Sequence, residues 1–322
     1  MKKRIGELDF IKGIAIILVV LGHIVSQVWS QEPAVYEKSP LFLFCYSFHM
    51  PLFVFISGYV CSVTIKNDIN WLAKRLKRIG LPYFLALILW YIILRRETIS
   101  TFFSPMAYWY LPFVMIADTS FFFDRKTPKG CVFAAILIIS ALICKFEPFN
   151  IDIAHHLVRF IPFYFMGTVS PALMQKYKSK LIYIYSALTL IFIITVPFYR
   201  QGLDAQLNSL PWLTESDSVN TLVKVVILFI NKFIVPIAGI GAVMLLTRLM
   251  YSTKCTFTIR NAVEFIGKQT LFIYLLHDLF FVHFFNRNII NCVISLFTAT
   301  LIPILLSVLL TRINTVLSQK RK

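Results

Sequence analysis

Ten apolar stretches divide the chain, each separated from the next by a short polar or basic segment. A helix needs roughly 20 consecutive apolar residues to cross the hydrocarbon core of a bilayer, and most of the stretches approach that length. The pattern therefore predicts an all-α, polytopic membrane protein with about ten transmembrane helices. The stretches cover approximately residues 8–29, 41–63, 80–95, 105–122, 130–144, 156–173, 181–198, 223–247, 263–284 and 289–311.

The composition excludes a soluble fold for these 322 residues. Hydrophobic residues make up 58% and charged residues 15%, whereas soluble domains have about 45–50% and about 25%. So few charges cannot cover the core that so many apolar residues would form. The first stretch continues past Gly22-His23 without a small-residue cleavage site, so we expect a retained helix rather than a signal peptide. With no repeat and no soluble segment of its own, we expect one integral-membrane domain over residues 1–322.

The positive charge predicts an orientation in the membrane. The net charge is +17, and 32 residues are Lys or Arg. They lie in short clusters between the apolar stretches and not on one amphipathic face, which excludes a soluble nucleic-acid-binding protein. If the N-terminus is cytoplasmic, about three quarters of the Lys and Arg residues fall on the cytoplasmic side. The positive-inside rule therefore predicts that both termini are cytoplasmic.

The six cysteines form no close pair along the chain. Most of them lie inside or beside apolar stretches, so neither a disulfide framework nor a metal knuckle is indicated. We therefore expect no metal. They are Cys45, Cys61, Cys131, Cys144, Cys255 and Cys292.

All six histidines fall on the outer side of the membrane in this topology. Leaving an ionisable group in lipid is costly, so histidines within the membrane are functional candidates. A lone histidine near a helix end is also commonly an interfacial residue, and that alternative stays open. The six are His23, His49, His155, His156, His277 and His283.

Lys12 and His23 share one face of the first predicted helix. They are eleven residues apart, which at about 100° per residue returns to within about 20° of the same direction, some ~16 Å along the axis. One stripe therefore carries a cation near the cytoplasm and an imidazole near the outer surface. In the other reading, Lys12 extends to the inner headgroups while His23 packs within the helix bundle. Asp9 either pairs with Lys12 or caps the start of the helix.

The same residues carry a resemblance. The stretch 8–15 running on to Leu21-Gly22-His23 resembles the opening signature of the integral-membrane acyltransferase family 3, a basic residue followed after ten positions by histidine. The family commonly has Arg where this chain has Lys12, which keeps the charge but loses the planar fork. Later stretches resemble further family motifs in the same order, so the resemblance extends from residue 8 to about residue 278. These stretches are 48–59, 74–83, 108–111, 160–167 and 266–277.

The resemblance implies transfer of an acyl group, usually acetyl from acetyl-CoA, to a hydroxyl of a cell-envelope glycan or a lipid-linked sugar. It also implies a multi-pass protein of a bacterial inner (plasma) membrane, with the lipid bilayer and the acceptor as its partners. The identity of the acceptor, the choice between acetyl and another acyl group, and the oligomeric state stay open.

The resemblance, together with the stripe, suggests how acetyl-CoA binds. CoA is strongly anionic, and cationic side chains bind phosphate through charge-assisted hydrogen bonds. We expect its phosphates near Lys12 and the basic cluster that contains Lys74, Arg75 and Arg78. Topology explains Arg75 and Arg78 equally well. The pantetheine arm would then present the thioester near His23.

His23 is the candidate general base, because the ordinary pKa of histidine, about 6.5, lies close to working pH. The tetrahedral oxyanion needs a hydrogen-bond donor, for which Ser57 and His277 are the candidates. Ser57 beside Gly58 is equally explained by close helix packing.

Four residues are candidates for binding the acceptor. Tyr108 and Trp109 offer rings on which a sugar could stack, and His49 and Arg159 complete the set. Aromatic residues at this depth are also common interface anchors.

A transporter or flippase is the main alternative function. Buried ionisable groups line transport routes as readily as catalytic sites. We find no clear inverted repeat and no matched pair of Gly- or Pro-broken stretches, which such folds often have. A sensor or assembly scaffold is less favoured, because the tails are short.

Overall fold

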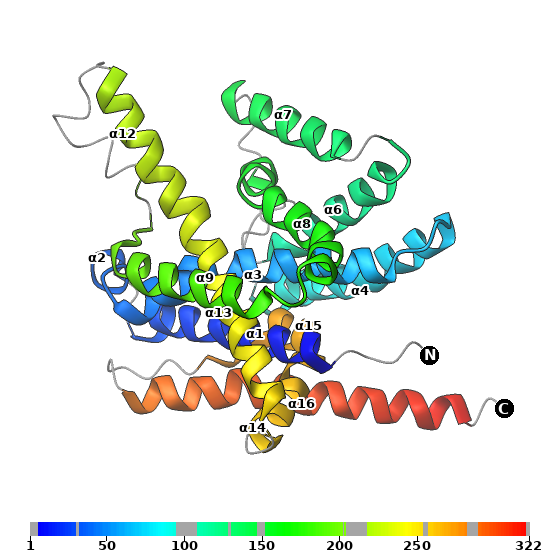
Figure 1. Cartoon of the computed structure of the whole chain (residues 1–322). Coiled ribbons are helices and arrows are strands. Elements are labelled where there is room, and N and C mark those ends of the chain that lie inside the picture. The colour runs from blue at the N-terminus through cyan, green and yellow to red at the C-terminus, as the bar shows by residue number, and fades with distance from the viewer. Residues whose placement is uncertain are drawn as a thin grey trace. The chain divides into compact units, whose positions relative to one another are not determined.

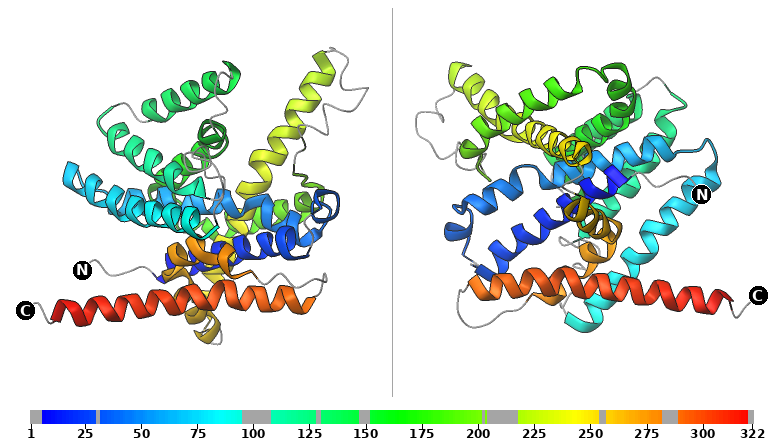
Figure 2. Two further views of the ribbon diagram at one scale, coloured as in Figure 1. Left: turned by 180° about the vertical axis from the view of Figure 1, so that it is seen from behind. Right: turned by 60° about the horizontal axis from the view of Figure 1, so that its bottom comes forward.

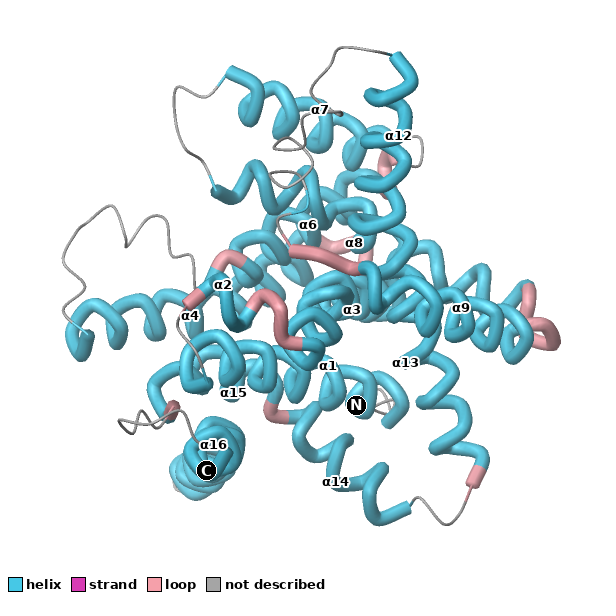
Figure 3. The backbone as a smooth tube through the Cα atoms, turned by 90° about the vertical axis from the view of Figure 1, so that its left-hand side faces the viewer, coloured by secondary structure: helices cyan, strands magenta, loops and turns pink. Residues whose placement is uncertain are grey.

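A computed structural model describes most of the chain, and within that part the elements are helices and no strand occurs (Figures 1 and 3). The predicted all-α class is therefore confirmed for these residues. The described residues are 6–29, 32–94, 108–127, 130–146, 152–201, 203, 218–253, 257–281 and 289–319.

Six of the described helices are long and apolar enough to cross a membrane, so the predicted count of ten is not confirmed. Helix α4 (Ile69–Leu94) begins with a charged segment, and α6 (Tyr110–Asp124) and α7 (Cys131–Phe146) are short. Part of the fourth predicted stretch, residues 105–107, lies outside the described residues. The orientation with cytoplasmic termini stays a prediction. The six spans are Gly6–Trp29, Pro40–Thr64, Ile153–Lys176, Leu181–Phe198, Asn220–Ser252 and Ile289–Arg312.

The ninth predicted stretch, 263–284, is not one continuous helix. It contains the end of α14 (Phe257–Lys268), then α15 (Thr270–Leu276) and the 3₁₀ helix η5 (His277–Phe280). The helix is interrupted at Gln269, whose φ of −102° and ψ of 8° depart from α-helical values. His277 is the first residue of η5, directly after α15 ends. Residues 282–284 lie outside the described part.

The chain forms two compact units, and the first comprises Met1–Leu52 and Ser179–Lys322. Its elements, together with α14, α15 and η5, are α1 (Gly6–His23), the π-helix η1 (Ile24–Trp29), α2 (Pro33–Tyr36), the first half of α3 (Pro40–Thr64), α9 (Leu181–Thr195), η3 (Val196–Phe198), α12 (Ser218–Phe229), the π-helix η4 (Ile230–Ile234), α13 (Val235–Ser252) and α16 (Ile289–Gln319). Within this unit α13 lies against α9, while the long helix α16 contacts η1, α15 and η5 (Figures 1 and 2).

Two glycines bring the backbones of α1 and α14 into contact (Figure 1). A Cβ atom on Gly267 would lie 1.7 Å from the carbonyl oxygen of Asp9, and one on Gly13 would lie 2.1 Å from that of Val263. Only glycine permits such an approach, as in close helix pairs in membranes generally. His23 and His277 each follow one of these glycines by ten residues. The crossing therefore sets the level at which the two histidines meet.

The second unit, Phe53–Lys178, contains a similar crossing. It comprises the second half of α3 with α4, α6, α7 and α8 (Asp152–Lys176). A Cβ atom on Gly58 of α3 would lie 2.1 Å from the carbonyl oxygen of Tyr164, and one on Gly167 of α8 would lie 2.0 Å from that of Phe55. Helix α6 contacts α4, α7 and α8.

The crossing of α1 and α14 predicts that Gly267→Ala is strongly destabilising. The new methyl group has to push the two backbones apart, and overpacking of this kind costs about 1–3 kcal/mol or more. We expect the apparent melting temperature of the protein in detergent to fall by several degrees. Gly80→Ala is the matched control, because its new Cβ would lie 3.4 Å from the flexible end of Met115. Equal melting temperatures for the two variants would contradict the crossing.

Candidate active site

His23, Gln27, His277 and Asp278 form a polar cluster in the first unit. The imidazole rings of His23 and His277 are 5.2 Å apart between centroids. The amide nitrogen of Gln27 lies 3.2 Å from His23 Nδ1 and 3.4 Å from Asp278 Oδ1. Asp278 Oδ1 is in turn 3.3 Å from His277 Nε2. The structure therefore brings the predicted catalytic residues His23 and His277 together. The carboxylate of Asp278 and the amide of Gln27 lie beside them.

The ring of His277 is held in one orientation. It is buried, with 3% of its surface exposed. Its Nδ1 lies 3.0 Å from the carbonyl oxygen of Ile273 and 2.9 Å from that of Tyr274, so this nitrogen donates a proton to the backbone. Nε2 has no hydrogen-bond partner among the described residues. Nε2 is therefore the ring nitrogen that is not committed to the backbone.

His49 belongs to the same unit and reaches His23 through an aromatic contact. Its Nδ1 donates to the carbonyl oxygen of Cys45 at 2.7 Å, and its ring is 4.8 Å from that of Tyr46. The Tyr46 ring is in turn 6.4 Å from His23. His49 is thus two rings away from the predicted base, in a buried position.

Helix α1 is α-helical from Gly6 to His23, as the predicted stripe of Lys12 and His23 requires. Lys12 Nζ lies 3.3 Å from Asp9 Oδ1, which is the pairing that the sequence left open. The Lys12 side chain keeps 28% of its surface exposed, whereas Asp9 is buried. Directly after His23 the chain continues as the π-helix η1. Such widened turns are frequent at functional sites.

Ser57 lies in the second unit. Its hydroxyl oxygen is 2.6 Å from that of Tyr110, and the two groups share a hydrogen bond. Its neighbour Gly58 makes the close crossing with α8, so the packing explanation has a direct structural basis.

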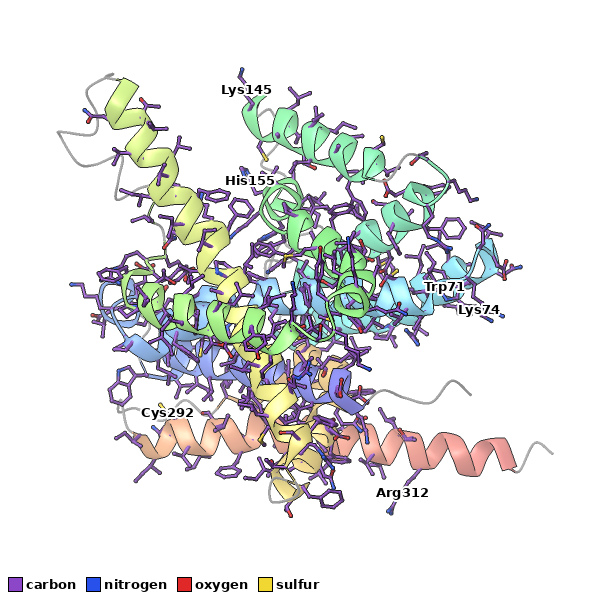
Figure 4. The ribbon with its side chains drawn as sticks, in the orientation of Figure 1. Trp71, Lys74, Lys145, His155, Cys292 and Arg312 are labelled. Atoms are coloured by element: carbon purple, nitrogen blue, oxygen red, sulfur yellow. The ribbon has the colours of Figure 1, made fainter. Side chains whose placement is uncertain are left out.

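Arg75 is buried in a charged network in the second unit. Its Nε donates to Asp118 Oδ2 at 2.5 Å and its Nη2 to Oδ1 at 3.0 Å, while the Tyr164 hydroxyl donates to Oδ1 at 2.5 Å. Arg75 is 8% and Asp118 0% exposed. The Trp71 ring also lies near the guanidinium, 5.6 Å from it. Lys74 and Arg78 are exposed on the same helix, and Lys74 projects from α4 in Figure 4.

The predicted acceptor-binding aromatic residues are engaged with other side chains. The Trp109 ring stacks on His156 at 3.9 Å and on Phe160 at 4.9 Å. Tyr108 is buried. Arg159 is exposed, with its guanidinium 5.1 Å from the Phe160 ring. His155 is exposed on α8 (Figure 4), and His283 lies outside the described residues.

Sequence reasoning missed Gln27 and Asp278. Both carried a usable signal: Gln27 follows His23 by four residues, so it shares that helix face, and Asp278 adjoins His277. The contact between them joins positions 251 apart in the sequence, which spacing alone does not reveal.

Comparison with known proteins gives four findings. A model of the Acyl_transf_3 family, described as an acyltransferase domain, matches residues 5–312. The chain is 26% identical over 296 residues to the nodulation protein NolL of Mesorhizobium japonicum. The aligned region covers 85% of this chain and 75% of that protein. It is also 54% identical over 57 residues to NolL of Sinorhizobium fredii. This aligned region covers 18% of this chain and 16% of that protein. No solved structure matches.

The buried network around Arg75 predicts that Asp118→Ala destabilises the protein. Removing the carboxylate leaves a buried guanidinium without its partner, which costs roughly 3–5 kcal/mol. We expect a large loss of apparent melting temperature and of folded yield in detergent. Tyr164→Phe is the milder comparison, because it removes one hydrogen bond and keeps the ion pair. An Asp118→Ala protein as stable as the wild type would show that the pair does not stabilise the fold.

Proposed function

Because the chain belongs to the acyltransferase family 3, it is a membrane acyltransferase, and we propose that it transfers acetyl from acetyl-CoA to a carbohydrate hydroxyl. The acceptor is a cell-envelope glycan or a lipid-linked sugar, and the protein is a multi-pass protein of the inner (plasma) membrane. The observation that carries the proposal is the cluster of His23, His277 and Asp278 at one end of α1, with Lys12 on the same helix.

His23 acts as the general base. The acceptor oxygen forms a bond to the thioester carbonyl carbon while His23 takes the hydroxyl proton. The tetrahedral intermediate then collapses, the carbon–sulfur bond breaks, and the departing CoA thiolate recovers the proton from the imidazolium. Histidine suits both proton transfers, because a ring nitrogen of the imidazole accepts the proton in the first step and returns it in the second. The reaction consumes acetyl-CoA and the hydroxyl, yields an ester and free CoA, and needs no metal.

His277 supports the reaction as a hydrogen-bond donor. Its Nδ1 proton is committed to the backbone carbonyls of Ile273 and Tyr274, so Nε2, which lies 3.3 Å from Asp278 Oδ1, is the ring nitrogen that can turn to a reacting group. When it carries a proton, Nε2 stabilises the oxyanion that develops on the thioester carbonyl. The contact between the two imidazoles favours His277 for this role. Ser57, hydrogen bonded to Tyr110, stays the second candidate.

Lys12 holds the phosphates of acetyl-CoA. Its ammonium group is partly exposed, and its pairing with Asp9 fixes its position on α1. On α4, Lys74 and Arg78 are the exposed candidates for the same task, whereas the guanidinium of Arg75 is already bonded to Asp118. Arg159 is the exposed candidate for binding the acceptor. A sugar can stack on Tyr108 or Trp109 only after neighbouring side chains move, because Tyr108 is buried and Trp109 is stacked on His156 and Phe160.

Replacing His23 tests the proposed base. In reconstituted vesicles with labelled acetyl-CoA and envelope-glycan extract, we expect His23→Ala to lower the rate of label transfer by about 10²–10⁴-fold, the usual contribution of general base catalysis. His155→Ala is the matched control, because this histidine is exposed on α8. Transfer that survives in His23→Ala removes His23 as the base. Solute flux through the vesicles without any binding of CoA would favour the transporter function.

Replacing Lys12 tests the assignment of the donor phosphates. A charged hydrogen bond contributes about 1.5–3 kcal/mol, so we expect Lys12→Ala to raise the KM for acetyl-CoA by about 10–100-fold. The kcat at saturating donor stays close to that of the wild type. Lys12→Arg restores the charge and should restore the KM. A KM unchanged in Lys12→Ala rejects the assignment, and the melting temperature shows whether loss of the contact with Asp9 disturbs the fold.

A further inference from the structure

Two hydrogen-bond acceptors face each other in the cluster of His23, His277 and Asp278. His277 Nδ1 gives its proton to backbone carbonyls, so in the neutral ring Nε2 presents a lone pair. That lone pair lies 3.3 Å from the carboxylate oxygen Asp278 Oδ1. A lone pair and a carboxylate repel each other at this distance unless a cation lies between them. The cation is either a proton or a metal ion.

The spacing of the ligand atoms suits a metal ion. One ring nitrogen of His23, one of His277 and a carboxylate oxygen of Asp278 all lie within 4.8 Å of one another. Zinc binds such nitrogen and oxygen atoms at about 2.0–2.2 Å, so neighbouring ligands of a tetrahedral site are about 3.3 Å apart. The pair from His277 and Asp278 already has this separation, whereas a charged N–H···O hydrogen bond prefers about 2.7–2.9 Å. The ligand atom of His23 lies no further than 4.8 Å from the other two.

The surroundings of the three ligands resemble those of a bound metal. A histidine that binds a metal commonly donates its other ring N–H to a backbone carbonyl or a carboxylate, as His277 does toward Ile273 and Tyr274. A ligating carboxylate is commonly hydrogen bonded as well, and Asp278 accepts a contact from Gln27. Gln27 also touches His23, so ligands from distant parts of the chain are held within reach before an ion arrives.

We infer that His23, His277 and Asp278 form a binding site for a divalent transition metal of the zinc class. Two imidazoles and one carboxylate select Zn²⁺ over Mg²⁺ and Ca²⁺, which prefer sites made of oxygen atoms alone. Three protein ligands leave one position of a tetrahedral site open to water or another small ligand. Nothing in the proposed reaction requires this ion.

Occupation of the site inhibits acetyl transfer, and this part of the inference rests on the proposed function. A ring nitrogen of His23 bound to zinc no longer has the lone pair that accepts the hydroxyl proton. The ion also takes Nε2 of His277, the proposed donor to the oxyanion. Zinc therefore inhibits reversibly, and a chelator restores transfer.

Metal binding is measured directly on the full-length protein in detergent after treatment with a chelator. Competition with a chromophoric zinc indicator should give one Zn²⁺ per chain. Asp278→Asn and His277→Gln should each weaken binding about tenfold or more, and His155→Gln should not change it. X-ray absorption at the zinc edge of the wild-type protein, which needs no variant, should show nitrogen and oxygen ligands. Size-exclusion elution shows that each variant is folded.

Three binding results would overturn the site: no zinc bound, sulfur ligands from the free cysteines, or undiminished binding in both Asp278→Asn and His277→Gln. Bound zinc that leaves the transfer rate unchanged would overturn the inhibition. Transfer of acetyl with no metal binding removes the site and leaves the proposed function. Metal binding in a protein that transfers no acetyl group removes the proposed function and leaves the site.

Discussion

The contact between the backbones of α1 and α14 is the constraint on which the candidate site depends. Gly13 and Gly267 allow this approach, because any side chain at Gly267 would overlap the carbonyl of Asp9. From the crossing, α1 leads to His23 and the segment after α14 leads to His277, each ten residues further on. The two imidazoles thus meet because two helices are fixed in register at one point. In lipid, where no hydrophobic force drives helices together, close van der Waals contact of this kind is one of the interactions that hold helices together.

The polar groups of the two units have different consequences. In the second unit Asp118 accepts three hydrogen bonds from Arg75 and Tyr164, so a buried positive charge is balanced and the contacts tie α4, α6 and α8 together. In the first unit the cluster of His23, His277 and Asp278 has an acceptor that no donor satisfies. This acceptor is Nε2 of His277, which has no hydrogen-bond partner among the described residues. A balanced network stabilises a fold, whereas an unbalanced cluster accepts a proton or a cation from outside. This difference favours the first cluster as the candidate site and a structural role for the second.

The sequence predicts those features that follow from local patterns. Long apolar stretches predict helices, because a backbone in lipid has to satisfy its own hydrogen bonds, and the helical repeat places Lys12 and His23 on one face. Features that depend on tertiary contacts were missed. Arg75 lies in a basic cluster of the sequence, which does not show that its side chain is buried against Asp118. The interruption at Gln269 and the pairing of Gln27 with Asp278 likewise depend on distant segments. Hydropathy alone also counted short and charged stretches as spans. Among the described residues, six helices are long and apolar enough to cross a membrane.

In the proposed reaction, acetyl-CoA extends along α1 from Lys12 to His23. The most direct measurement is a cryo-EM structure of the protein in lipid nanodiscs with an acetyl-CoA analogue whose thioester is replaced by an unreactive thioether. We expect density for the phosphates beside Lys12 and for the analogue's sulfur within about 4 Å of the His23 ring, close to a reactive geometry. Density for the pantetheine arm away from α1, or a His23 ring that faces lipid, would contradict this expectation.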